Sequence, residues 1–391
     1  MNLHQAEFNL SPELTRLFSV FVLLGVAVML VGLGMAPERV WPSLLLVSYF
    51  VLGMGLAAVV FIALQYVTNG AWGVAIRRVP EAMTVFILAG ALGLAVVFLA
   101  HRSLYSWTAA AHDAGNTAAW FKRFWLTWPF FLARAVVYLL VWIAFARAIA
   151  RNSQLQDRDG DVAYTHRNAR LSALFLVVFG ITLWLASYDW LMSLEPEWFS
   201  TIFGMYSFSG LFASGIAAII IFAVALQKLG PLEGILREDH LHDLGKLLFA
   251  FSTFWAYIWF CQYMLIWYTD IPEETGYFVK RMQGTWRPLF LLNFMLNWTV
   301  PFLALLPRAT KRTPSLLVKV AVIVLLGRWL DLYLIILPPF MGHKPSFGAW
   351  EFGLMLGAIG ASALLFFRAL RRAAPVPMRD PWLSDSLHHH Q

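Results

Sequence analysis

The sequence carries few charged residues for its length. Of its 391 residues, 13% are charged and 60% are hydrophobic, whereas an ordinary soluble domain is about 25% charged. A water-soluble fold could not cover its surface with so few charges, and a disordered chain would carry more charge and fewer aromatic residues. The composition therefore excludes both classes and predicts a protein that crosses a membrane several times.

Motifs that bind cofactors are missing as well. The single cysteine, Cys261, cannot form an internal disulfide, and alone it cannot hold an iron–sulfur cluster, which needs about four ligands. The chain has no CxxCH motif, no Walker A motif and no GxGxxG helix start. We therefore expect no covalently bound cofactor and no metal site. We attribute the net charge of +7 to membrane topology, not to nucleic-acid binding.

Ten apolar runs in the sequence are each long enough to cross the hydrocarbon core of a bilayer. They are continuously apolar, whereas the strands of a membrane barrel alternate in polarity over about ten residues, so they predict helices. The predicted spans are 14–36, 40–67, 82–101, 126–150, 169–189, 199–227, 244–268, 286–307, 316–338 and 348–370.

Lys and Arg are unevenly distributed between the two sides that these spans define. The side that includes both termini has 19 of the 29 basic residues and the other side has eight, while Arg134 and Arg328 lie within spans. Both termini are therefore predicted to be cytoplasmic. Because the loops are short, we predict one ten-helix transmembrane domain over 1–372 and a polar C-terminal tail over 373–391.

Predicted spans five and nine end in a similar way. Asp189 lies seven residues before Pro196, and Asp331 lies seven residues before Pro338, each at the outer end of an outward-running helix. An offset of four helices preserves the chain direction. The motif therefore favours two four-helix bundles, spans 2–5 and 6–9, with spans 1 and 10 flanking them. The spacing alone is also compatible with coincidence.

Ionisable groups inside the predicted spans are candidate functional residues, because each costs about 3 kcal/mol or more in the bilayer unless it is paired or hydrated. Arg134 lies several residues into span four, roughly 12 Å deep, and needs a polar partner, which makes it either a structural ion pair or part of a site. Arg328 and Asp331 lie three residues apart on one helix face. They either neutralise each other or exchange protons.

Three more candidates lie at the outer ends of the spans. Asp189 and Glu195 belong to an acidic segment at the outer end of span five, which is either an ordinary interfacial helix end or part of a site. His101 ends span three, where it either anchors the helix to lipid headgroups or exchanges protons near neutral pH.

The remaining candidates lie at the start of span seven and in span six. His242, Asp243 and Lys246 open span seven on the inner side, where they either cap the helix or form the mouth of a proton path. Tyr206 and Ser207 lie among small residues in span six, which favours close helix packing and, as the alternative, a hydrated stripe.

Several tryptophan-rich segments resemble the NrfD-like family of polysulfide-reductase membrane subunits, and within it the ActF-type subunits of bacterial alternative complex III. The segments are HRSLYSW at 101–107, PFFLAR at 129–134, SYDWLMSLEPEWF at 187–199 and WLDLY at 329–333. The similarity extends from about residue 80 to 340, and the first two spans and the last match mainly by hydropathy.

This resemblance implies a subunit of a quinol:cytochrome c (electron acceptor) oxidoreductase in the inner (plasma) membrane of a bacterium, in a respiratory or photosynthetic chain. It implies two four-helix bundles and oxidation of menaquinol or ubiquinol near the outer face, with proton release outside. The implied partners are a sister NrfD-like subunit, an iron–sulfur subunit, multihaem and monohaem cytochrome c subunits and small membrane subunits. Iron–sulfur clusters and c-type haems would lie on these partners, so this chain is not expected to be catalytic alone.

The resemblance leaves two roles open. Either His101, Arg134 and Asp189 line a quinone site on this chain, or the sister subunit binds the ring and this chain serves as scaffold and proton conductor. A quinol site needs a proton acceptor, hydrogen bonds to the ring oxygens and apolar room for the tail. The predicted proton path uses His242, Asp243, Lys246, Arg328, Asp331, Glu195, Tyr206 and Ser207.

Two other classes of function also stay open. A secondary transporter would have helices interrupted by Gly or Pro at corresponding mid-span positions, whereas the prolines here lie mostly at span ends. A structural anchor would need the buried charges only for assembly. In every case the lipid bilayer is the expected environment and nucleic acid is not an expected partner.

Overall fold

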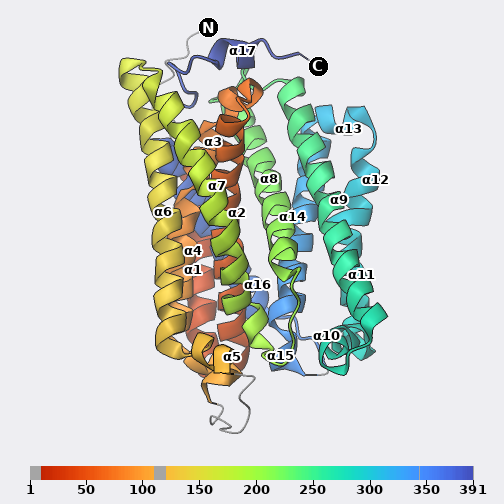
Figure 1. The fold of residues 1–391 in the computed structure, drawn as a ribbon. Coiled ribbons are helices and arrows are strands. Elements are labelled where there is room, and N and C mark those ends of the chain that lie inside the picture. Colours follow the sequence, from red (N-terminus) through yellow and green to blue (C-terminus); the bar gives the residue numbers. More distant parts are fainter. Residues whose placement is uncertain (1–9, 110–119, 343, 391) are drawn as a thin grey trace.

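The computed structural model describes residues 10–109, 120–342 and 344–390, and within these ranges the chain is helical without β-strands. Nine helical segments of the described ranges are long and apolar enough to cross a membrane. The chain is therefore an all-helical, multi-pass membrane protein. Its long helices lie side by side, and helices α5, α10 and α15 lie at the end of the bundle opposite to α17 (Figure 1). We call these two ends the α5 end and the α17 end.

Long helices make up most of the bundle. Helix α4 follows the short α3 after a break at Thr84, and α11, the π-helical turn η7 and α12 form one continuous stretch. The long elements are α1 (Pro12–Met35), α2 (Pro37–Val67), α3 (Arg78–Met83) with α4 (Val85–Ala100), α6 (Trp128–Asp159), α7 (Ala163–Trp190), α8 (Phe203–Leu229), α9 (Glu238–Thr269), α11 (Arg287–Phe294) with η7 (Met295–Thr299) and α12 (Val300–Leu305), α14 (Pro314–Ile336) and α16 (Ala349–Leu370).

Short helices lie at the two ends of the bundle. The outer loop predicted between spans seven and eight contains α10, so it is not irregular. The short α-helices are α5 (Trp120–Trp125), α10 (Pro272–Met282), α13 (Arg308–Arg312), α15 (Pro338–Met341) and α17 (Leu383–Leu387), and the 3₁₀ segments include η1 (Ala71–Ile76) and η2 (Arg102–Leu104).

Two predicted inner loops are shorter than the sequence suggested. The loop predicted over 151–168 is wrong, because α6 continues to Asp159 and α7 begins at Ala163. The turn between them is made at Gly160, whose φ of 78° suits glycine. Helix α9 likewise begins at Glu238 instead of near residue 244. Both extensions are polar, so the hydropathy that marks a span does not reveal them.

The tenth predicted span, 316–338, is present as helix α14. It is less uniformly apolar than the nine segments above, because Lys319, Arg328 and Asp331 all lie within its 23 residues. Its last turns are buried against other helices, from Gly327 to Ile336. Arg328 and Asp331 therefore face the protein interior, whereas Lys319, near the start of the helix, is exposed.

The long helices form two groups of neighbours. In the first, α2 contacts α4 and α7, and α6 contacts both of these helices. In the second, α8 contacts α9 and α14, and α12 contacts both of these helices. Contacts between α2 and α8 join the two groups, and the α1–α16 pair lies against α2.

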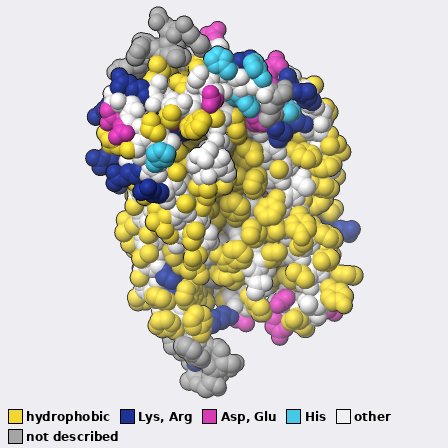
Figure 2. All heavy atoms as spheres, turned by 45° about the horizontal axis from the view of Figure 1, so that its top comes forward, with side chains coloured by type: hydrophobic (Ala, Val, Ile, Leu, Met, Phe, Trp, Pro, Cys, Tyr) yellow, Lys and Arg dark blue, Asp and Glu magenta, His cyan; other side chains and the backbone are white. Residues whose placement is uncertain are grey.

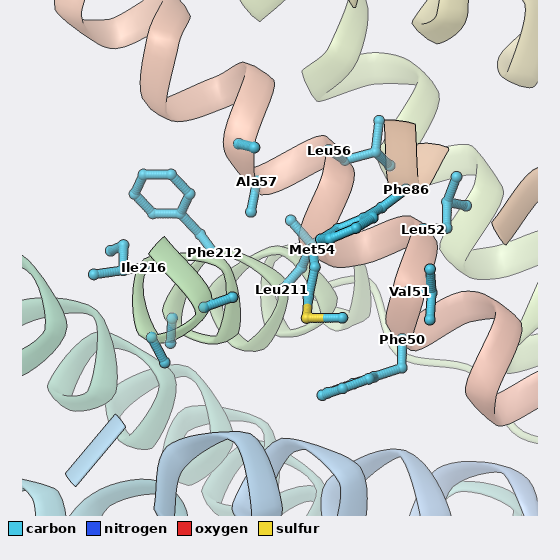
Figure 3. Close-up of a cluster of buried hydrophobic side chains, with 14 of the residues drawn as sticks. Phe50, Val51, Leu52, Met54, Leu56, Ala57, Phe86, Leu211, Phe212 and Ile216 are labelled. Atoms are coloured by element: carbon cyan, nitrogen blue, oxygen red, sulfur yellow. The ribbon is translucent and has the colours of Figure 1, made fainter. Parts of the chain in front are cut away.

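Helix α2 forms the centre of the bundle. Its most apolar stretch is buried on all sides, which is why it is hydrophobic around its whole circumference. Leu52 and Met54 of α2 pack near Phe86 of α4 and near Leu211 and Phe212 of α8 (Figure 3). On the outside, hydrophobic side chains cover the middle of the molecule, and Lys, Arg and His side chains gather toward the α17 end (Figure 2).

The C-terminal tail folds back over the α17 end. Buried Asp380 pairs with Arg77, which follows η1. Ser386 of α17 donates to the Trp72 carbonyl of η1 at 2.6 Å, and His240 of α9 lies 3.1 Å from the Ser386 carbonyl. The tail therefore contacts elements of both helix groups.

Close approach of glycines attaches α1 to the rest of the bundle. A Cβ atom at Gly25 would lie 2.5 Å from the Cα of Gly357 in α16, so the two backbones touch directly, as small residues allow in membranes. The side chains on the rest of α1 are mostly exposed to the lipid side. The Gly25–Gly357 contact is therefore one of the close contacts that attach α1, together with Gly360 of α16 against Phe18 and Phe21.

We predict that Gly25→Leu destabilises the protein by about 1–3 kcal/mol, because the new side chain overpacks the α1–α16 contact. Thermal unfolding in detergent micelles measures the effect as a lower midpoint. Gly34→Leu is the matched control on the same helix, since a Cβ there meets no atom within 4 Å. Equal midpoints for the two variants would contradict the role of this contact.

Candidate functional site

A buried arginine and a buried aspartate bind each other in the first helix group. Arg134 of α6 donates from Nε to Asp189 Oδ2 and from Nη2 to Asp189 Oδ1, both at 2.8 Å. The two residues are 7% and 1% exposed. This bidentate geometry is the strongest form of arginine–carboxylate pairing. Asp189 is therefore the polar partner that we predicted for Arg134 from its depth in the membrane.

Two aromatic residues complete this group, which we call the Asp189 cluster (Trp125, Arg134, Tyr138 and Asp189). Trp125 donates from Nε1 to Asp189 Oδ1 at 2.7 Å, and the Tyr138 hydroxyl donates to Oδ2 at 3.2 Å. The guanidinium of Arg134 lies 4.0 Å from the Trp125 ring centroid. Each Asp189 oxygen thus accepts two hydrogen bonds, so the acceptor capacity of the carboxylate is well used within the cluster.

His101 lies apart from the Asp189 cluster. It caps α4 and stacks on Trp41 of α2, with ring centroids 5.1 Å apart and an interplanar angle of 5°. Its Nε2 is 3.5 Å from the Ser103 hydroxyl. The structure therefore brings Arg134 and Asp189 together, as the predicted quinone site requires. His101, the third residue of that predicted site, contacts Trp41 of α2 instead.

A second buried carboxylate lies in the other helix group. Asp331 of α14 is fully buried and pairs with Arg328 at 2.5 Å, one turn earlier on the same helix. The Tyr206 hydroxyl of α8 donates to Asp331 Oδ1, and Asn293 of α11 donates to the same oxygen at 3.0 Å. We call these four residues the Asp331 cluster. It joins three helices through one carboxylate.

Small residues make room for this cluster. A Cβ at Gly210 of α8 would lie 2.4 Å from Arg328 Nη1, so the guanidinium packs directly on the α8 backbone. A Cβ at Gly327 would lie 3.0 Å from the Asn297 side chain in the π-helical turn η7. Asn297 in turn donates to Asn293 Oδ1 at 2.7 Å. Gly210 and Gly327 thus allow close helix packing, and the polar side chains of Arg328 and Asn297 lie against them.

A buried arginine connects the α5 end to the neighbourhood of Asp331. Arg281 of α10 is 1% exposed and donates from Nη2 to Glu195 Oε1 at 2.6 Å. It also donates to the carbonyls of Leu334 and Tyr277 at 2.7 and 2.9 Å. Glu195 remains partly exposed. The Arg281–Glu195 pair therefore extends from the protein surface to the last turn of α14.

A small cavity lies between that pair and the Asp331 cluster. Its volume is about 20 Å³, which is enough for one water molecule. Among its lining residues are Asp331, Tyr206, Asn293, Gln262 and Arg281. Polar residues thus line a space in which a water molecule fits, close to Asp331 and Arg281.

Tyr277 borders the same cavity from α10 and supports Arg281. Its ring stacks on Trp198 at a centroid distance of 3.9 Å, and the Arg281 guanidinium lies 3.4 Å from its ring centroid. Burial raises the pKa of Tyr277 to about 12. The hydroxyl is therefore protonated at neutral pH and available as a hydrogen-bond donor.

The predicted inner residues lie far from the Asp331 cluster. Asp243 binds Lys246 and His389 of the tail, each at 2.7 Å. It is the sixth residue of α9, so the alternative of a helix cap is wrong, because the helix begins earlier than predicted. Along α9, Asp243 and His242 precede Gln262 by about twenty residues, or roughly 28 Å at 1.5 Å per residue.

Ser207 also lies outside the Asp331 cluster, although it follows Tyr206 in sequence. Its hydroxyl is 2.7 Å from the Tyr49 hydroxyl of α2. Because successive residues of a helix point about 100° apart, Tyr206 faces the second helix group and Ser207 faces the first. This hydrogen bond therefore links α2 to α8 in the centre of the bundle.

Sequence reasoning missed several residues of these clusters. Asn293 and Asn297, four residues apart in an apolar run, are a pattern that could have indicated a polar helix face. Arg281 looked like an ordinary loop cation, and Trp125 and Tyr138 carry no sequence signal that separates them from other interfacial aromatic residues. Only the fold brings them to a carboxylate.

A larger hollow of about 570 Å³ lies among α1, α2, α8, α14 and α16. Its lining is apolar except for Lys228 and Ser362. A binding site for a polar ring needs several polar groups that converge on it. This hollow suits hydrocarbon better than a ring with two oxygens.

Fold and clusters together describe a polytopic helical membrane protein with charged groups buried between its helices. The chain matches no protein-family model and none of the curated proteins with which it was compared.

We predict that Asp189→Asn lowers the free energy of unfolding by about 3–5 kcal/mol, because it leaves the Arg134 charge buried without its counter-ion. Unfolding of the purified protein in detergent measures this. Glu197→Gln is the control, since it removes an exposed carboxylate from the same loop and should change stability by less than about 0.5 kcal/mol. If both variants unfold alike, the Asp189 cluster does not stabilise the bundle.

Proposed function

We propose that this chain is the proton-conducting membrane subunit of a quinol:electron acceptor oxidoreductase. The observation that carries the proposal is the fully buried Asp331 carboxylate, which hydrogen-bonds to Tyr206 and Asn293 beside a water-sized cavity. Buried ionisable groups in membranes are costly and mark ion or proton pathways more often than they mark simple packing. The resemblance to NrfD-like subunits, and within them to ActF-type subunits of alternative complex III, supports the same class.

In this proposal, Asp331 is the group that holds the proton in mid-path. Its Oδ2 is paired with Arg328, whereas Oδ1 accepts from the Tyr206 hydroxyl and the Asn293 amide. A water in the adjacent cavity would accept a proton from the protonated carboxyl group and pass it toward the α5 end. Arg281 would orient that water without titrating, because guanidinium stays charged.

Glu195 would be the exit of this half of the path. It binds Arg281 and is partly exposed at the α5 end, so it can exchange a proton with the aqueous phase. At the α17 end, Asp243 with Lys246 would collect protons for a separate inner half, roughly 28 Å away along α9.

We assign binding of the quinol ring to a partner subunit. The Asp189 oxygens are occupied by Arg134, Trp125 and Tyr138, and His101 stacks on Trp41 of α2 instead of joining them, so these predicted residues do not form one hydrogen-bonding set. Menaquinol or ubiquinol would be oxidised on a sister NrfD-like subunit, and electrons would pass to iron–sulfur and cytochrome c subunits.

Topology and location complete the proposal. Ten spans, with α14 included, would form two four-helix bundles plus the α1–α16 pair. The α17 end would face the cytoplasm, because 19 of the 29 Lys and Arg residues belong to that side of the predicted topology. The membrane would be the bacterial inner membrane.

A purely structural anchor is the second candidate. The well-satisfied Asp189 cluster favours it, because a carboxylate with four donors is suited to holding helices together. The two functions differ in what a neutral Asp331 does to an assembled complex. An anchor would lose assembly without losing turnover for each assembled complex.

We predict that Asp331→Asn, measured in membranes that contain the whole complex, lowers the number of protons carried across the membrane per quinol oxidised, counted beyond those that quinol oxidation itself releases, on the order of tenfold. The variant keeps the size of the side chain but cannot take up a proton as a carboxylate does. Glu197→Gln, which neutralises an exposed carboxylate in the loop between α7 and α8, is the control and should leave this proton transport unchanged.

Amounts of assembled complex are measured in parallel, so that turnover is expressed for each complex. Unchanged proton transport and unchanged quinol oxidation in the Asp331→Asn complex would refute the proton path. Reduced assembly with normal turnover would favour the structural anchor instead.

A further inference from the structure

An arginine-lined hollow opens at the α17 end, on the outside of the first helix group. Its volume is about 480 Å³, and it lies between α3–α4, α6 and the end of α16. This hollow is remote from the Asp331 cluster and plays no part in the proposed proton path. It therefore needs a separate explanation.

Positive charge dominates the lining of this hollow. Four arginines border it, and Glu81 is the one acidic residue in its lining. Glu81 is already bound by buried Arg78, which also binds Asp157. The other three arginines of the lining, which have exposed side chains, face the space without an acid of the lining to balance them: Arg147, Arg151 and Arg372.

Helix α6 presents its share of these charges on one face. Ile143, Arg147, Arg151 and Gln154 follow one another at intervals of three and four residues and all line the hollow. Like charges four residues apart repel each other and destabilise a helix, and a bound anion would offset this repulsion. The spacing of these arginines is therefore more favourable when the hollow holds an anion than when it is empty.

The floor of the hollow has unsatisfied polar atoms. Arg78 Nε and Glu81 Oε1 are buried, and neither has a hydrogen-bond partner in the described part of the chain. Buried polar atoms of this kind are uncommon and call for a partner. A ligand with both donors and acceptors, or a ligand with its bound water, would provide one.

The other walls of the hollow are apolar and continue along the membrane-facing surface. Leu88 of α4, 40% exposed, lines the hollow, and Leu92 follows one turn further from the α17 end with 62% exposed. On α6, Leu140 is 61% exposed one turn beyond Ile143. A hydrocarbon chain that starts in the hollow would thus have an apolar track beneath it.

We propose that this hollow binds the headgroup of an anionic phospholipid, with its phosphate at Arg147, Arg151 and Arg372. Its acyl chains would lie along α4 and α6. Arginine forks bind phosphate through paired hydrogen bonds, and basic pockets between helices at the membrane surface are suited to anionic headgroups. A free phosphate ion would use the same arginines but would leave the apolar track empty.

The test is lipid retention by the purified protein in nanodiscs that contain equal amounts of phosphatidylglycerol and phosphatidylcholine. Native mass spectrometry of the released protein counts each lipid that remains bound. The expected result is enrichment of phosphatidylglycerol on the unmodified protein. Arg147→Gln with Arg151→Gln should reduce this enrichment on the order of tenfold, because two surface charges are lost.

Two further variants keep the test independent of folding and of overall charge. Arg167→Gln with Arg170→Gln removes two exposed arginines from α7 that do not line the hollow, and it should retain the enrichment. Arg147→Lys with Arg151→Lys keeps the charge and should retain most of it. Equal loss in the α7 control and the α6 variant would overturn the proposal.

Competition separates the two sources of phosphate. Inorganic phosphate added to the nanodiscs should not displace the bound lipid, since the acyl chains contribute to binding. Complete displacement by inorganic phosphate, or no preference for phosphatidylglycerol over phosphatidylcholine, would also overturn the proposal.

Discussion

The free energy of placing a charge in an apolar bundle constrains most of this structure. A charged group between membrane helices costs about 3 kcal/mol or more unless a counter-ion or water is present. Arg134, Arg281 and Arg328 are all buried, and each binds a carboxylate. Arg134 and Arg281 each bind a carboxylate of another element, and Arg328 binds a carboxylate one turn away on its own helix. The charged pairs therefore also determine which helices approach each other and where glycine is required.

The two buried carboxylates differ in a way that separates structural from functional roles. Asp189 accepts two hydrogen bonds at each oxygen, from α6 and from the segment before it, and the cluster is closed. Asp331 is held as tightly, but a cavity of about 20 Å³ lies beside it and leads toward Arg281. An adjacent water-sized cavity, more than burial itself, therefore distinguishes a candidate for proton transfer from a carboxylate that stabilises helix packing.

Both ends of the bundle carry charge, but they use it differently. At the α17 end, the tail closes over the helices through Asp380 and α17, while the arginines of α6 remain directed at an open hollow. At the α5 end, Arg281 and Glu195 connect the surface with the interior. The first end therefore has features that suit lipid headgroups, and the second has features that suit exchange of protons with water.

The sequence by itself determined that the chain is helical and crosses a membrane, because apolar runs and a low charge content depend only on composition and local order. It also indicated the Arg328–Asp331 pair, since a spacing of three residues places both on one helix face. Tertiary structure alone decided that Arg134 meets Asp189, that His101 turns to Trp41, and that Arg281 and Asn293 join Asp331 or its cavity. These partners lie on different helices, and their meeting depends on packing angles and glycine contacts that no local pattern encodes.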